Sequence, residues 1–347
     1  MGCGFSIDAS SSKESKIIAV LGARGLQGGA LCDALNRHFP TEFKIRAITR
    51  DKSKLNSGKY GEVVEADLDD LASLQNAFKG AYGVFGLTNF WESFSAAKEK
   101  EQARNIAQAC KNAGVKHCVW STLEYTVDTL KPMGVQPLQG DYTVPHFDAK
   151  FEANQFFSDL GVPTTYLYTC MYMENLINPA TFLPKDHGNG LMLGNNMADE
   201  KLPLVCTKDI GIAAAMCFGD PDTKNTSQYI ASDVLTMSEI AAIYTEVVGK
   251  QINYVPFDDD TFRSMDFPGA AELSNMFQFM RENANFKLNR NLSKMQELCD
   301  RDKLTTLRDF LTANKEKIPF ESKEGAKEET MSTKKLATPD DEEEIDC

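Results

Sequence analysis

The feature that most constrains the fold is a glycine-rich turn between an apolar run and a helical pattern. Ile17–Leu21 is apolar enough for a buried strand, and apolar residues from Leu26 to Leu35 recur at helical spacing. The turn has the spacing G-x-x-G-x-x-G, and its residues are Gly22, Ala23, Arg24, Gly25, Leu26, Gln27 and Gly28. Such glycines let a pyrophosphate approach the backbone at a helix N-terminus. The turn predicts a dinucleotide site; the alternative is a glycine-rich loop that binds nothing.

Strand-like and helical segments alternate from the first strand to about residue 170. The predicted strands are Ile17–Leu21, Ile45–Thr49, Glu62–Ala66, Tyr82–Leu87, His117–Ser121 and Val162–Tyr168. Helical patterns lie between them, so the chain is predicted to be α/β, with a doubly wound parallel-sheet Rossmann fold over residues 15–170. Residues 171–320 are predicted to form a smaller α+β lobe, loop-rich over Met171–Leu204, with some return of the chain to the sheet.

The end of the second strand bears on the choice between NAD and NADP. Arg50 follows that strand, and its guanidinium can bind a 2′-phosphate through two hydrogen bonds, whereas an NAD site usually has Asp or Glu there. Asp51 weakens the inference because it lies next to the same site, while Lys54 adds positive charge. The sequence favours NADP (NADPH), with NAD bound more weakly; the alternative is that Arg50 is only a surface cation.

Polar residues after the third and fourth strands are further candidates for contact with the cofactor. Asp67 follows the third strand and could accept a hydrogen bond from the exocyclic amine of adenine. A turn or helix-capping role for Asp67 is an almost equal alternative. Thr88 and Asn89 end the fourth strand, where short polar groups would line the cofactor.

The usual catalytic pair of carbonyl reductases with this fold is incomplete. These enzymes commonly have a Tyr four residues before a Lys on one helix, but His146 stands four residues before Lys150. Ser121 ends the fifth strand, so the candidate set is Ser121, His146 and Lys150. His146 could donate a proton near neutral pH. A histidine without a chemical role is the preferred interpretation, and Lys150 is a better candidate for a ribose or phosphate contact.

The ends of the chain and its composition limit the partners. Gly2 and Cys3 match a myristoylation pattern with an adjacent palmitoylation site, or match it by chance. The formal charge is −13, and residues 321–347, a predicted disordered tail, hold ten acids and four lysines. We therefore expect no nucleic-acid partner. The scattered cysteines predict a reduced cytoplasmic protein, and the histidines and cysteines lack the spacing of metal ligands, so no metal site is expected. No apolar run reaches ~20 residues, so any attachment to a membrane is expected to be through lipid.

Together these residues resemble the NmrA-like family, an atypical branch of the short-chain dehydrogenase/reductase superfamily. The resemblance spans about residues 16–315. It rests on Gly22–Gly29, Ile48–Arg50, Ala66–Asp70, Thr88–Ser93, His146–Lys150, Met171–Leu176 and Phe267–Ala270. The strings Thr-Asn-Phe-Trp-Glu-Ser and His-Phe-Asp-x-Lys are similar to the subgroup of the animal NADPH-sensor protein HSCARG. Arg24 departs from the family, which often has Thr there.

The resemblance implies a site and a function. The residues expected to contact NADP are the glycine loop, Arg50, Lys54, Asp67, Leu68, Thr88, Asn89, Lys150, Met171, Tyr172, Met173 and Glu174. The subgroup implies a redox sensor without dehydrogenase activity, whose oligomeric state and unidentified protein partners respond to the nucleotide; a homodimer is compatible with this. One alternative is an NADPH-dependent reductase of a quinone, aldehyde or phenol, with an acid supplied by Tyr125, Tyr142, Tyr168 or Tyr172. Another is a lipid-anchored scaffold with a vestigial nucleotide fold.

Overall fold

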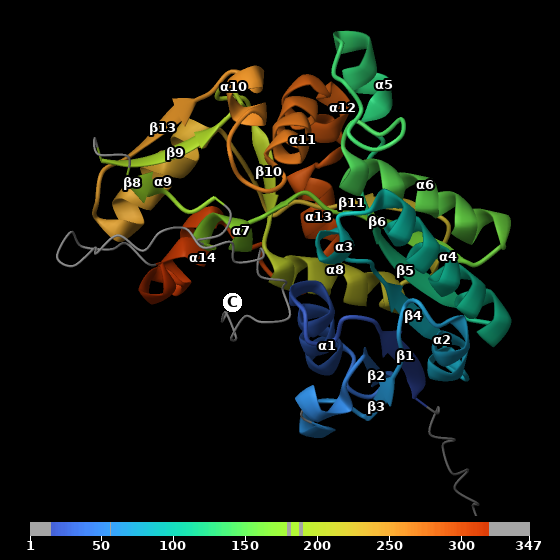
Figure 1. Cartoon of the computed structure of the whole chain (residues 1–347). Coiled ribbons are helices and arrows are strands. Elements are labelled where there is room, and N and C mark those ends of the chain that lie inside the picture. Colours follow the sequence, from blue (N-terminus) through green and yellow to red (C-terminus); the bar gives the residue numbers. More distant parts are fainter. Residues whose placement is uncertain (1–14, 56, 179–181, 187–189, 319–347) are drawn as a thin grey trace, which may run out of the picture.

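A seven-stranded parallel sheet forms the centre of the protein (Figure 1). The computed structural model describes residues 15–55, 57–178, 182–186 and 190–318. The strand order is β11-β6-β5-β4-β1-β2-β3. The bounds are β1 Lys16–Val20, β2 Phe43–Thr49, β3 Glu62–Glu65, β4 Gly83–Gly86, β5 His117–Thr122, β6 Thr164–Tyr168 and β11 Ser227–Tyr229. The order reverses between β1 and β4, and ligands of such sheets bind outside the carboxyl ends of the strands at that point.

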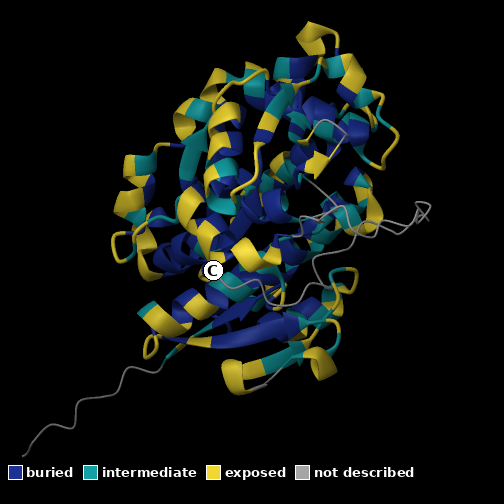
Figure 2. Cartoon of the chain, turned by 90° about the vertical axis from the view of Figure 1, so that its left-hand side faces the viewer, coloured by how far each residue is buried: buried dark blue, intermediate teal, exposed yellow. Residues whose placement is uncertain are grey.

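Helices cover both faces of the sheet, because the strands are apolar on both sides. In β1, Ile18 and Val20 pack into one core, while Ala19 packs into the other. The first core contains α1 (Leu26–His38) and α8 (Thr207–Gly219); the second contains α2 (Leu71–Phe78), α4 (Ala96–Ala113) and α6 (Pro145–Asp159). A Cβ on Gly211 of α8 would lie 2.3 Å from the Ala30 carbonyl carbon, so this glycine permits the close α1–α8 contact. Figure 2 shows buried residues concentrated between these layers.

The rest of the chain forms a smaller lobe with two three-stranded sheets. Their orders are β12-β10-β7 and β13-β9-β8. The strands are β7 Met171–Tyr172, β8 Lys185–Asp186, β9 Leu191–Asn195, β10 Leu202–Val205, β12 Asp233–Leu235 and β13 Ile252–Pro256. The helices include α7 Glu174–Ile177, α9 Met237–Val248, α10 Asp259–Arg263, α11 Ala270–Glu282, α12 Ala284–Asn289, α13 Leu292–Leu298 and α14 Leu307–Ala313.

The expectation of a loop-rich segment over Met171–Leu204 is therefore wrong for much of its length. β7, β9 and most of β10 lie in this segment, and they pair with strands well separated in sequence. The expected return of the chain to the main sheet is present, since β11 adds to β6 in parallel and α8 packs on α1. The division near residue 170 otherwise stays a prediction.

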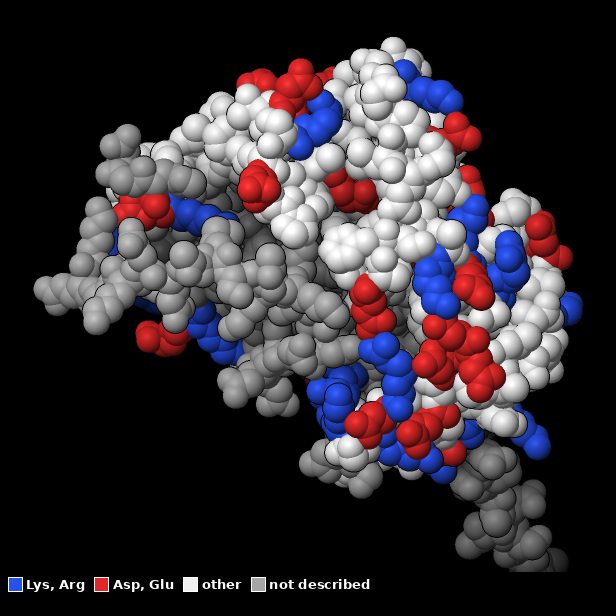
Figure 3. All heavy atoms as spheres, in the orientation of Figure 1, with Lys and Arg blue, Asp and Glu red and all other residues white. Residues whose placement is uncertain are grey.

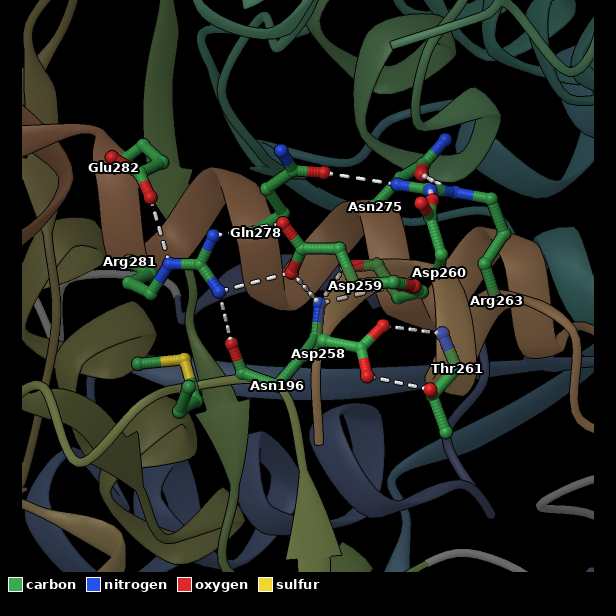
Figure 4. A network of polar contacts seen from close by, with 12 residues as sticks. Asn196, Asp258, Asp259, Asp260, Thr261, Arg263, Asn275, Gln278, Arg281 and Glu282 are labelled. Atoms are coloured by element: carbon green, nitrogen blue, oxygen red, sulfur yellow. Dashed lines mark hydrogen bonds and ion pairs between the residues drawn. The ribbon is translucent and has the colours of Figure 1, made fainter. Parts of the chain in front are cut away.

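Helix α11 is fixed to the small lobe by a network of charged and amide groups (Figure 4). The Arg281 guanidinium donates to both carboxylate oxygens of Asp259 at 2.9 Å. Asn196, which follows β9, donates from Nδ2 to Asp259 Oδ1 at 2.8 Å. Nearby, Arg263 of α10 donates to the side chains of Asn275 and Gln278 on α11. Because the two-pronged Arg281–Asp259 contact acts together with these single hydrogen bonds, α11 has a defined position relative to β9 and α10.

Two predicted segments lie outside the described residues. Gly2 and Cys3, the predicted lipidation sites, belong to residues 1–14, and the predicted tail belongs to residues 319–347. Lipidation of Gly2 and Cys3 and the disorder of the tail therefore stay predictions. Among the helices of the described residues, none combines the length and apolar character that crossing a membrane requires.

A buried histidine in β5 predicts a pH-dependent stability. His117 is fully buried, and its Nε2 lies 2.8 Å from the Thr165 hydroxyl. Burial lowers the pKa of His117 from 6.5 to about 4. Between these pH values the unfolded chain takes up a proton that the folded chain does not, so stability falls as the pH drops through this window. The contribution is on the order of 3 kcal/mol.

The measurement is urea unfolding at pH 7 and pH 4.5 for the wild type and for His117→Gln. The wild type should lose more stability than the variant between the two pH values, because only the wild type carries the buried imidazole. An equal loss in both proteins would contradict this assignment to His117.

Candidate functional site

The glycine turn lies at the carboxyl end of β1, with α1 beginning directly after it. Gly22 has a φ of +61°, which glycine adopts without strain, and the Gly25 N–H donates to the Gly22 carbonyl at 2.8 Å. A Cβ on Gly28 would lie 2.2 Å from the Gly22 oxygen, whereas a Cβ on Gly25 would meet it at an ordinary 3.4 Å. Gly28 is therefore required for packing, whereas a Cβ at Gly25 would meet only the Gly22 oxygen.

The N-terminus of α1 has the properties of an anion site. Gly25 is its N-cap residue and has no side chain that could accept a hydrogen bond from the first backbone N–H groups of the helix. These groups, with the positive end of the helix dipole, favour a phosphate. Two side chains brace the turn: Tyr60 donates to the Ala23 carbonyl at 3.2 Å, and Gln27 donates to the Tyr172 hydroxyl at 2.7 Å. Tyr172 is in β7, so the small lobe reaches the glycine turn directly.

Arg50, the predicted 2′-phosphate ligand, lies beyond the end of β2 and is half exposed. Its Nη2 donates to Glu92 Oε1 at 2.6 Å, and its Nη1 donates to Glu92 Oε2 at 3.2 Å. Glu92 belongs to α3 (Phe90–Ser93), which follows β4. β2 and β4 are the two neighbours of β1, so this pair links the strand ends on either side of the glycine turn. Figure 3 shows acidic and basic side chains alternating over this part of the surface.

Asp51, which weakened the inference for NADP, is used in the local turn. Its Oδ1 accepts from the Ser53 hydroxyl at 2.6 Å and from the Ser53 N–H at 2.9 Å. These hydrogen bonds lower the pKa of Asp51, with smaller contributions from the charges of Lys54 and Arg24. The Asp51 carboxylate therefore accepts hydrogen bonds as the N-cap of the short helix Lys52–Lys54.

Asp67 also takes part in a turn, the alternative considered for it. Its Oδ1 accepts from the Asp69 N–H at 2.9 Å, while Asp70 is the N-cap of α2. Leu68 presents its carbonyl to the Asn105 side chain at 2.9 Å. Asp67 is exposed at the end of β3, so contact of its second oxygen with adenine stays a prediction.

Lys150 is engaged on every side by protein groups. Its Nζ donates to the Thr88 carbonyl and the Thr88 hydroxyl, both at 2.9 Å, and to Glu99 Oε1 at 2.5 Å. The Thr88 hydroxyl also donates to Glu99 at 2.7 Å. An ammonium group has three N–H donors, and three acceptors occupy them here. The three residues thus fasten α6 and α4 to the end of β4.

His146 faces the small lobe. Its Nδ1 lies 2.5 Å from Glu272 Oε1 of α11, and its backbone N–H donates to the same oxygen at 2.9 Å. Trp91 covers the imidazole at a ring separation of 5.0 Å. Ser121 is buried at the end of β5. The structure therefore places His146 and Lys150 on one helix but gives them separate carboxylate partners.

The remaining predicted contacts fall into two groups. Asn89 caps α3 by accepting from the Trp91 N–H at 3.2 Å. Met173 and Glu174 are buried in the core. Glu174 accepts from the Thr207 N–H at 2.9 Å and from its hydroxyl at 2.6 Å, thereby capping α8, and burial raises the pKa of Glu174. Asn89 therefore lies at the carboxyl edge of the sheet, whereas the Glu174 carboxylate is bound to Thr207 within the small lobe.

Among the four candidate tyrosines, all within the described part of the chain, Tyr172 contacts the glycine turn, where its hydroxyl accepts from Gln27 at 2.7 Å. Tyr142 donates to Glu152 and accepts from Lys100. Tyr125 stacks on Phe151, and Tyr168 stacks on Tyr229. Burial raises the pKa of Tyr172 well above its usual value, so it remains protonated at neutral pH.

A family model described as the NmrA-like family matches residues 14–311 of the chain. The chain belongs to the NmrA-like family. The NmrA-like family domain-containing oxidoreductase FrzB of a Cladobotryum species is 27% identical over 292 residues, covering 76% of this chain and 83% of the relative. Quinone oxidoreductase 2 of Escherichia coli is 27% identical over 249 residues, covering 71% of this chain and 79% of the relative.

Solved structures of the family confirm the α/β Rossmann-like architecture. The E. coli quinone oxidoreductase, described as NADPH-dependent, superposes with a TM-score of 0.64 at 24% identity, covering 84% of this chain and 97% of that one. NmrA, described as a negative transcriptional regulator, superposes with a TM-score of 0.67 at 18% identity, covering 86% and 95%. The proteins similar to this chain thus include some described as oxidoreductases and NmrA, described as a negative transcriptional regulator.

Three carboxylates at this NmrA-like site were missing from the sequence-based candidates. Glu99 could have been found, because it extends the inward stripe of Ala103, Ile106 and Cys110 by one turn. Glu92 lies in the string Thr-Asn-Phe-Trp-Glu-Ser, but nothing in that string indicates that it pairs with Arg50. Glu272 has no local signal, because its partner His146 lies 126 residues earlier in the chain.

Proposed function

We propose that this protein binds NADP(H) across the carboxyl edge of the main sheet and acts as a nucleotide-responsive regulator without dehydrogenase activity. The pyrophosphate would lie on the backbone at Gly25 and the N-terminus of α1. Arg50 would face the 2′-phosphate. The redox-sensor role and membership of the HSCARG subgroup belong to this proposal, supported by the strings Thr88–Ser93 and His146–Lys150.

The main support for a regulatory function is that Thr88 and Glu99 accept hydrogen bonds from all three N–H donors of Lys150. In the Tyr–Lys arrangement, the lysine charge promotes ionisation of the tyrosine and the ammonium holds the ribose. Here a carboxylate balances that charge, no Tyr stands at position 146, and His146 is bound to Glu272. These contacts of His146 and Lys150 support the proposal, because both side chains are bound to carboxylates and the Lys150 donors are occupied.

The same contacts supply a path for regulation. Trp91 of α3 packs on His146, and His146 contacts Glu272 of α11. The network of Figure 4 fixes α11 to α10 and to the loop after β9. A nucleotide that binds one arrangement of α3 better than another would shift the population of states of the small lobe.

Arg50→Ala should weaken NADPH binding by ~1–3 kcal/mol, because one charged hydrogen-bonding partner of the 2′-phosphate is lost. NADH lacks this phosphate and should bind the variant almost as it binds the wild type. Calorimetric titration of both proteins with both nucleotides provides the comparison. Equal losses for NADPH and NADH would refute the role of Arg50.

The regulatory proposal is tested by turnover assays with NADPH and a panel of quinones, aldehydes and phenols. We expect no NADPH oxidation above the protein-free rate, although NADPH binds. Turnover that disappears in a folded Lys150→Ala variant would overturn the proposal and establish an enzyme.

The second candidate is an NADPH-dependent reductase of a quinone, aldehyde or phenol. The relatives described as oxidoreductases favour it, as does the Tyr172 hydroxyl beside Gln27 of the glycine turn. Reduction of a quinone makes less demand on a tyrosine acid at position 146. Under this alternative, Tyr172→Phe should lower the turnover number by a larger factor than it raises the NADPH dissociation constant, because the hydroxyl would act in the reaction as well as accept a hydrogen bond from Gln27.

A further inference from the structure

The ion pair at the end of β2 has a consequence for nucleotide selection. Arg50 and Glu92 meet through two separate N–H···O contacts, at 2.6 and 3.2 Å. This is the two-pronged geometry in which a guanidinium also binds a phosphate. The Glu92 side chain is 30% exposed and the Arg50 side chain 57% exposed, so a ligand can reach the pair from solvent.

We infer that Glu92 competes with the 2′-phosphate of NADP(H) for Arg50, and so limits the preference for NADP(H) over NAD(H). This inference rests on the proposed function, because it requires a nucleotide at the glycine turn. The 2′-phosphate must displace the carboxylate from the guanidinium before it can form both hydrogen bonds with Arg50. NAD(H) has a 2′-hydroxyl instead and leaves the pair intact.

The competition is expected to raise the dissociation constant of NADP(H) only modestly. An exposed ion pair contributes little, and two-pronged geometry places this one at the upper end of that range. A cost of this size corresponds to about fivefold in the dissociation constant. Glu92 would therefore lower the affinity for NADP(H) by about this factor and leave the affinity for NAD(H) nearly unchanged.

The experiment is calorimetric titration of the full chain and of Glu92→Gln with NADPH, NADP and NADH. Glutamine keeps the size of the side chain and removes its charge. We expect Glu92→Gln to tighten NADPH and NADP binding by about fivefold and to change NADH binding by less than about twofold. Weaker NADPH binding, or equal tightening of NADPH and NADH, would overturn the inference.

A matched control separates competition from a general change of charge. Asp69 is also acidic and close to this region; Lys98 lowers its pKa through a hydrogen bond, and Arg50 contributes through space. Its carboxylate, however, is bound by Lys98 at 2.8 Å and by Gln102 at 3.0 Å. Asp69→Asn should change NADPH affinity by less than about twofold. A gain equal to that of Glu92→Gln would show that net charge, not competition, sets the affinity.

The double variant Arg50→Ala/Glu92→Gln tests whether the effect passes through Arg50. In the Arg50→Ala background, Glu92→Gln should no longer tighten NADPH binding, because nothing remains for Glu92 to compete for. A persistent gain would contradict competition and indicate direct repulsion. A wild-type protein that binds neither NADPH nor NADH would instead refute the proposed function itself, and the inference with it.

Discussion

Valine at position 25 is expected to abolish detectable NADPH binding while leaving the fold intact. Gly25 has a φ of −78° and a ψ of 170°, which valine adopts readily, and a Cβ there meets the Gly22 oxygen at 3.4 Å. The added methyl groups would occupy the space in which a pyrophosphate approaches the start of α1. We expect a loss of at least about a hundredfold, or ~2.7 kcal/mol, in calorimetric titration.

Two neighbouring glycines provide controls. A Cβ on Gly29 meets the Ala23 oxygen at 3.5 Å, so Gly29→Ala should keep both the fold and the binding. A Cβ on Gly28 would lie 2.2 Å from backbone, so Gly28→Ala should lower the melting temperature. NADPH binding of wild-type strength in Gly25→Val would show that the nucleotide does not lie on this turn.

Removing Glu99 is expected to destabilise the protein by ~3–5 kcal/mol, because the Lys150 charge would lose its buried carboxylate. Glu99 is 1% exposed, and the Lys150 side chain is 13% exposed. Urea unfolding of Glu99→Ala measures the effect. The matched control is Glu101→Ala on the same helix, where the side chain is 59% exposed and pairs with Lys98; its cost should stay below ~1 kcal/mol.

A paired substitution distinguishes charge from packing in this prediction. Glu99→Leu combined with Lys150→Leu removes both charges and should recover much of the stability lost by either change alone. If the double variant is as unstable as the sum of the single variants, the two side chains act independently, and the account of Lys150 as a charge fixed by Glu99 is wrong.

The main sheet could be predicted because its signals are local. Strong apolar runs such as Ile17–Leu21 are bounded by turns, and the observed β1 differs from that range by one residue at each end. Gly114 ends α4 with a φ of +66°, a conformation that glycine adopts readily, so the stop of this helix is also specified locally. The strands of the small lobe gave no such signal. β9 pairs with β13 about sixty residues later, so its register depends on tertiary contacts.

The site shows the same division. The glycine turn was predicted from its spacing and Arg50 from its position after the second strand, and the structure places them on neighbouring strand ends. The carboxylates that bind the predicted cations were not, because pairing across the fold cannot be read from one segment. Glu99 stands in the run Lys98-Glu99-Lys100-Glu101, which resembles a solvated surface, yet it is buried. Because Glu99 pairs with Lys150, it determines whether the lysine is interpreted as a nucleotide ligand or as part of the fold.

The most direct test of the central claim is calorimetric titration of the wild-type protein with NADPH, NADP and NADH under one set of conditions. The account predicts one nucleotide site per chain, with NADPH and NADP bound more tightly than NADH. Absence of binding by all three, or NADH bound as tightly as NADPH, would contradict a site built from the glycine turn and Arg50.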